Sequence, residues 1–113
     1  MRPDERRSEH RRLQELTRQS VLRLINSELN LAVTMISLAE TEAELGDDAH
    51  GRGLLQKVEQ ALESVRHHMQ NDRISDDERQ EILQRLRRTE KDLAAVKRSV
   101  LAEARSARQK AEA

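Results

Sequence analysis

The sequence has no Phe, Trp, Tyr or Cys, and only one Pro and three Gly among its 113 residues. Without cysteine the chain forms no disulfide and offers no thiolate for catalysis. Without aromatic residues it lacks the side chains that bury the largest areas and that stack on bases. With so few glycines it has no Gly-rich phosphate loop. Leu, Ile, Val, Met and Ala must therefore build the whole interior.

The chain also has no net charge, because its 21 Lys and Arg residues balance its 21 Asp and Glu residues. This balance gives no argument for a nucleic-acid or acidic partner. The first residues lack the apolar stretch of a secretory signal. No run of consecutive apolar residues approaches the roughly 20 that span a membrane. We therefore expect a cytoplasmic protein without a membrane partner.

Apolar residues recur at steps of three and four along most of the chain, which predicts an all-α fold. The first helix should begin at Pro3 and end at a left-handed Gly46. Either Asp47 or Asp48 should cap a short second helix. The segment Ser75-Asp76-Asp77-Glu78 is a capping box that should start the third helix. Short connections make neighbours antiparallel, which predicts a three-helix up-down-up bundle whose first and third helices are long.

The length of the chain indicates one domain, with its core over residues 21–100. Residues 1–20 should form a weakly anchored helical arm of mixed charge, and residues 101–113 an Ala-rich helical tail that frays. Helix lengths leave residues 4–20 and 97–113 projecting at opposite ends. These arms fray, or the first helix bends near Asn26-Ser27, or another chain covers them.

The first helix carries two neighbouring apolar stripes. One comprises Leu22, Ile25, Leu29, Ala32, Ile36, Ala39 and Ala43. The other comprises Val21, Leu24, Leu31, Met35, Leu38 and Leu45. Together they make a face wide enough to contact two neighbours at once.

Residues 31–62 resemble a single tetratricopeptide-repeat hairpin. The matching positions are Leu38-Ala39, the turn Leu45-Gly46-Asp47, the small residue Gly51, and then Leu55, Lys57 and Val58. A glycine inside a helix costs up to about 1 kcal/mol, and a close helix–helix approach at Gly51 would explain it. The repeat usually has an aromatic residue where this chain has Glu42, and we find one copy. The resemblance implies a protein-interaction scaffold. Residues 25–96 are also similar to small three-helix bacterial proteins, which implies no function.

The sequence contains no pattern of residues typical of a metal site or an active site. The four histidines do not converge as the three or four ligands of a zinc site would. No nucleophile elbow or P-loop is present. We therefore expect no enzyme activity, no catalytic residue, no cofactor and no metal.

An acidic cluster lies where the first helix meets the second, and comprises Glu40, Glu42, Glu44, Asp47 and Asp48. Negative charge is unfavourable at a helix C-terminus. Lys97 and Arg98 of the third helix should arrive level with it and compensate. The other interpretation is a docking surface for a basic partner.

The sequence thus favours a non-enzymatic helical protein–protein interaction module that associates with itself. The candidate interface residues are Leu13, Leu16, Val21 and Leu24 on one arm, and Val100, Leu101 and Ala104 on the other. The alternative is a small nucleic-acid-associated regulator that uses the third helix and the Arg-rich arm. Acidic residues between these arginines favour a solvated helix face instead.

Overall fold

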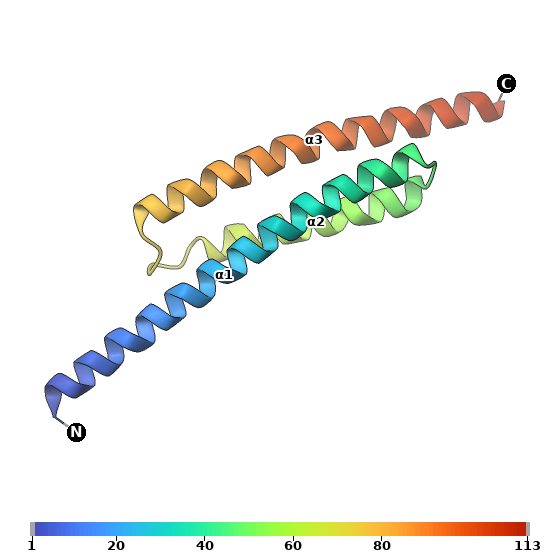
Figure 1. Ribbon diagram of the computed structural model, residues 1–113. Helices are drawn as coiled ribbons and strands as arrows, with labels where there is room; N and C mark the ends of the chain where they lie inside the picture. The colour runs from blue at the N-terminus through green and yellow to red at the C-terminus, as the bar shows by residue number, and fades with distance from the viewer. Residues whose placement is uncertain (1, 113) are drawn as a thin grey trace.

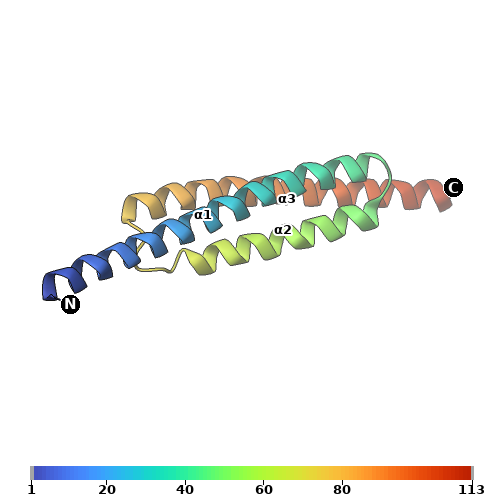
Figure 2. The ribbon, with the colours of Figure 1, turned by 60° about the horizontal axis from the view of Figure 1, so that its bottom comes forward.

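The computed structural model describes residues 2–112, apart from the side chains of residues 103, 104, 107 and 112. This part of the chain forms α1 (Pro3–Glu44), α2 (Asp48–His68) and α3 (Asp76–Glu112) and contains no strand. The all-α fold class is therefore confirmed. Consecutive helices run in opposite directions, and each helix contacts the other two (Figure 1 and Figure 2). The molecule is a rod of 81 × 22 × 16 Å.

Short-range hydrogen bonds set the helix ends. Gly46 has a φ of 87°, so it ends α1 in the left-handed conformation that was predicted. Asp47, and not Asp48, caps α2, because its Oδ1 accepts from the backbone N–H of His50 at 3.1 Å. The capping box of α3 is complete: Ser75 and Glu78 each donate a backbone N–H to the other's side chain at 3.1 Å. Polar groups near each end thus satisfy otherwise unpaired helix amides.

Helix α1 runs for 42 residues without a break, so it continues through Asn26-Ser27, where a bend was considered. The asparagines there bind α3 instead. Arg85 of α3 donates to the Oδ1 atoms of Asn26 at 2.5 Å and Asn30 at 3.2 Å. These residues thus link two helices along an uninterrupted α1.

The core forms where α2 and α3 pack on the first apolar stripe of α1. Its buried members on α1 are Ile25, Leu29, Ala32, Ile36, Ala39 and Ala43. Helix α2 contributes Leu55 and Val58 to the same cluster, together with other apolar residues. At the far end the core closes on Val100, which is 1% exposed.

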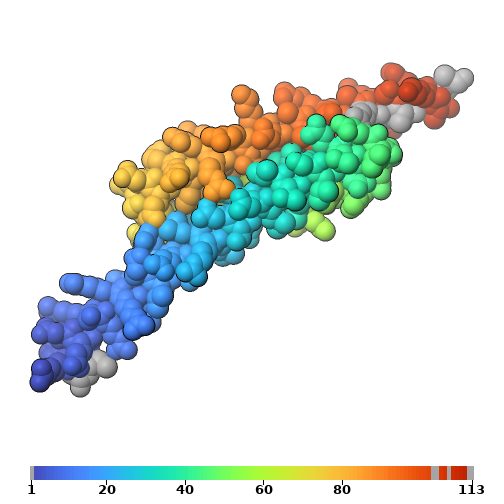
Figure 3. Space-filling view, in the orientation of Figure 1, coloured from blue at the N-terminus to red at the C-terminus, as the bar shows by residue number. Residues whose placement is uncertain are grey.

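The helices overlap only in part, so both ends of the rod project. Arg18 donates to Glu78 at 2.5 Å, which places the start of α3 level with residue 18 of α1. Residues before this level extend beyond the other helices, and α3 extends beyond the α1–α2 turn at the opposite end (Figure 1). The two arms thus project from opposite ends of the rod (Figure 3).

Candidate interaction surface

The second apolar stripe of α1 lies uncovered along the rod. Its leucines Leu24, Leu31, Leu38 and Leu45 are spaced seven residues apart and are 41%, 48%, 47% and 76% exposed. Helix α1 does contact both α2 and α3, as its wide apolar face predicted. Helices α2 and α3 both pack on the first stripe, and only Val21 and Met35 of the second are packed against the core.

Small hydroxyl residues alternate with these leucines. They are Ser20, Ser27, Thr34 and Thr41, all exposed and again seven residues apart. Together the eight residues form a heptad pattern in which one seam position is leucine and the other is small. We call this set the leucine seam.

The threonine hydroxyls of the leucine seam are already satisfied within α1. Thr34 donates to the carbonyl oxygen of Asn30 at 3.0 Å, and Thr41 donates to that of Ser37 at 3.1 Å. A group that is hydrogen-bonded can be buried without the desolvation cost of an unpaired one. The threonine positions of the seam can therefore be covered by another apolar surface at low cost.

A shallow groove of about 340 Å³ lies at the N-terminal end of the seam. It brings together all four residues predicted on the first arm: Leu13, Leu16, Val21 and Leu24. Thr17, Ser20 and His68 complete its lining. His68 comes from the end of α2, so the groove begins where α2 stops covering α1. We call it the arm groove.

The residues predicted on the second arm do not form a matching surface. Val100 is wrong as an interface residue, because it is 1% exposed and packs in the core of its own chain. Leu101 is 55% exposed and lines a separate groove with Leu55 and Arg52. The side chain of Ala104 lies outside the described residues. The two predicted sets thus lie at opposite ends of the rod.

Charged residues stand beside the seam but do not interrupt it. Arg23 and Glu44 each precede a seam leucine and are exposed. Neither forms an ion pair with another described residue. On the α2 side, Glu28 accepts from the Ser64 hydroxyl at 3.2 Å. The seam is therefore an apolar strip with charged edges.

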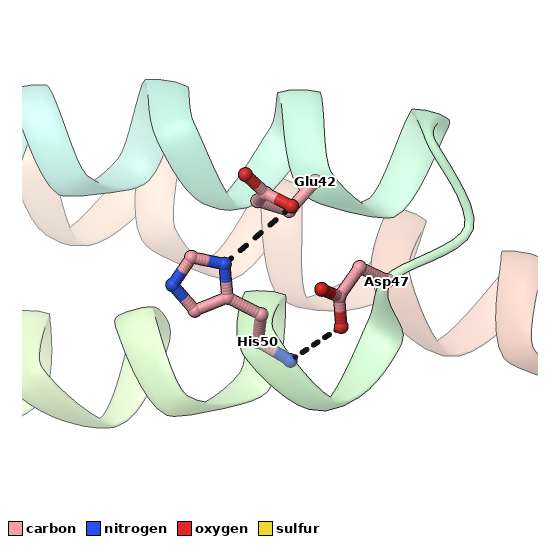
Figure 4. Close-up of side chains that lie close together, drawn as sticks. All are labelled: Glu42, Asp47 and His50. Carbon is pink, nitrogen blue, oxygen red and sulfur yellow. Dashed lines mark hydrogen bonds and ion pairs between the residues drawn. The ribbon is translucent and has the colours of Figure 1, made fainter.

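The α1–α2 turn gathers one histidine and two carboxylates that the sequence alone did not bring together. Ligand atoms of Glu42, Asp47 and His50 lie within 4.8 Å of one another (Figure 4). Asp47 and His50 are three residues apart in the sequence, whereas Glu42 reaches the group from the other side of the turn. His50 Nδ1 lies 3.4 Å from Glu42 Oε2, and Asp47 caps α2. These contacts belong to the hairpin turn itself.

The expected pairing of α3 with the acidic cluster is wrong for Lys97. Its Nζ pairs with Glu59 on α2 instead. Neither Lys97 nor Arg98 forms an ion pair with Glu40, Glu42 or Glu44 in the described structure. Lys97 and Glu59 line the same groove between α2 and α3, together with Leu101.

Two basic residues that the nucleic-acid alternative would use are already hydrogen-bonded to other residues of the same chain. Arg18 binds Glu15 and Glu78, and these hydrogen bonds raise the pKa of its guanidinium above the ordinary value. Arg85 is bound to two asparagines of α1. Arg6, Arg7 and Arg11 on the arm are exposed.

Helix α1 contains one window that is long and apolar enough, by length and composition, to cross a membrane. Of this window, 22% is buried inside the chain. A core helix with a second apolar face meets the same criterion, so this finding restates the presence of two stripes.

No protein-family model, curated protein or solved structure matches the chain. The tetratricopeptide resemblance of residues 31–62 therefore stays a prediction.

Proposed function

We propose that this protein is a three-helix up-down-up bundle that serves as a non-enzymatic protein–protein interaction module and associates with itself. The observation that carries the proposal is the leucine seam. Single exposed leucines are ordinary on a protein surface, whereas leucines repeated every seven residues along one helix face are typical of a helix–helix interface. From Leu24 to Leu45 the strip is about 32 Å long at 1.5 Å per residue.

Energetics support association along this strip. Full burial of a leucine side chain contributes about 1.5–3 kcal/mol relative to full exposure. Four partly exposed leucines per chain thus offer several kcal/mol to any partner that covers them. The thin core supports the same proposal, because a chain without aromatic residues gains stability when a second surface covers it.

The leucine seam is better suited to contact a protein than a lipid surface. Interfacial membrane helices commonly carry Trp or Phe anchors, which this chain lacks. Charges at Arg23, Glu28 and Glu44 also border the strip on both sides. Charged edges around an apolar strip are typical of helix–helix interfaces.

Sedimentation velocity of the full chain over a hundredfold concentration range tests the proposal. Interference optics are needed because the chain has no Trp or Tyr to absorb at 280 nm. We expect the mass to rise from the 13.1 kDa of one chain toward that of two. The mass of a single chain at every concentration would contradict self-association.

A matched pair of variants tests the surface. Leu31 on the seam and Val33 off it are 48% and 49% exposed, only two residues apart. Leu31→Lys should abolish association, whereas Val33→Lys should leave it intact. Equal effects of the two variants would remove the seam from the proposal.

A further inference from the structure

We infer that the occupant of the leucine seam is a second copy of this chain running antiparallel, with a two-fold axis that lies between the two α1 helices, level with Ala32 and Val33. The inference rests on the proposed self-association and adds its partner geometry. Three features of the described structure support it independently: side-chain size, the arm groove, and charge.

Side-chain size favours the antiparallel arrangement. About this axis, Leu24 lies level with Thr41 of the second copy, and Leu31 with its Thr34. By the same register Leu38 meets Ser27, and Leu45 meets Ser20. Every layer thus pairs a large side chain with a small one, which is how facing helices interdigitate without voids.

A parallel arrangement in register would pair like with like. Leu31 would lie beside Leu31 of the second copy, and Ser27 beside Ser27. Leucine layers would then hold the helices apart, while the serine and threonine layers would leave gaps that lose packing contacts. The strict alternation of leucine and small residues therefore selects the antiparallel register.

The arm groove gives the most exposed leucine a place to bind. Leu45, at 76% exposed, lies level with Ser20 of the second copy, which lines that groove together with Thr17, Val21 and Leu24. Ser20 is about 37 Å from Leu45 along the same helix, so a chain cannot fill its own groove. In a dimer with two-fold symmetry, Leu45 of each copy fills the arm groove of the other, because both copies contribute the same surface.

Charge agrees with the same register. Arg23 and Glu44 flank the seam on the side nearer α3, and the two-fold axis brings Arg23 of each copy beside Glu44 of the other. A parallel dimer would instead place the acidic ends of two α1 helices side by side. Like charges in contact are unfavourable, and parallel helix dipoles would add to the repulsion.

Spin-label distances in the full-length protein test the direction, and the absence of native cysteine makes single labels possible. Gln19→Cys and Ser37→Cys lie five helical turns apart on the same side of α1, so a parallel dimer gives both the same distance. The antiparallel dimer separates the two labels at position 19 by about 40 Å along the axis, and those at position 37 by about 14 Å. Equal distances would overturn the inference and leave self-association standing.

Charge reversal tests the register. Arg23→Glu alone and Glu44→Arg alone should each weaken dimerisation at least threefold, and the double variant should restore it. Failure of the double variant to recover would overturn this register. A single-chain mass for the unaltered protein would overturn the inference together with the proposed function. So would binding of the monomer to phosphatidylcholine–phosphatidylserine vesicles that Leu31→Lys abolishes, because lipid would then be the occupant.

Discussion

Gly51 of α2 lies so close to Ala39 of α1 that a Cβ on the glycine would stand 3.3 Å from the Ala39 carbonyl oxygen. Ala39 is itself fully buried. The two backbones therefore approach each other through a glycine on one helix and an alanine on the other. This crossing holds the α1–α2 hairpin together next to its turn.

The two glycines of α2 provide a matched comparison. Gly53 has nothing within 4 Å of its potential Cβ, so Gly53→Ala should stabilise the protein by up to about 1 kcal/mol through helix propensity. Gly51→Ala gains the same propensity but crowds a backbone carbonyl that cannot rotate away. We expect its free energy of unfolding to be about 1–2 kcal/mol lower than that of Gly53→Ala. Urea denaturation followed by circular dichroism measures both, and equal stabilities would contradict the close crossing.

The capping box should be energetically significant. Ser75→Ala removes the hydroxyl that accepts from the Glu78 amide, and we expect a loss of about 1 kcal/mol. Ser99→Ala is the control, since Ser99 is exposed in the middle of α3. There alanine is the better helix former, so stability should hold or rise slightly. A loss at Ser99 as large as at Ser75 would show that the cap is not the cause.

Stability should fall in acid partly through Glu78. The hydrogen bond from the Ser75 backbone lowers the pKa of Glu78, and Arg18 lowers it further. Because the folded pKa lies below the unfolded one, this contribution is present above the ordinary value of about 4.3 and is lost as the pH falls through the folded pKa. Glu78→Gln should therefore be less stable than the unaltered chain at pH 7, and the difference in free energy of unfolding should be smaller at pH 3.

Urea titrations at the two pH values measure that difference. Glu81→Gln serves as the control, because Glu81 is exposed on the same helix. If the difference in free energy of unfolding between Glu78→Gln and the unaltered chain is the same at both pH values, the ionic contribution is contradicted.

Substitutions at two adjacent residues of α3 should show where the core ends beside the α1–α2 turn. Val100 is 1% exposed, whereas Leu101 is 55% exposed. Val100→Ala should cost about 1–3 kcal/mol, because it removes buried methyl groups and leaves a cavity. Leu101→Ala should stay within about 0.5 kcal/mol of the unaltered chain, as surface substitutions usually do. Thermal denaturation of both variants decides whether the core ends at this position.

Part of the candidate surface was predictable. The four arm residues Leu13, Leu16, Val21 and Leu24 do lie together, because residues three and four apart share one helix face. Val100 was wrong as an interface residue, because it is buried in the core of its own chain together with the other inward-facing residues of α3. The partnership of Lys97 with Glu59 was not foreseeable, because it depends on which way α3 rotates against α2.

The sequence by itself determined where α1 ends and where α3 begins, because Gly46 and the Ser75–Glu78 pair act through backbone groups only a few residues away. It left the cap of α2 open between Asp47 and Asp48. It also determined that α1 has two apolar stripes. Only the tertiary structure decided which stripe is buried. When each of three helices contacts the other two, both neighbours of α1 lie on the same side of it, and its opposite side faces outward. The leucines of the leucine seam belong to the second stripe, and they lie on the side of α1 that this geometry leaves uncovered.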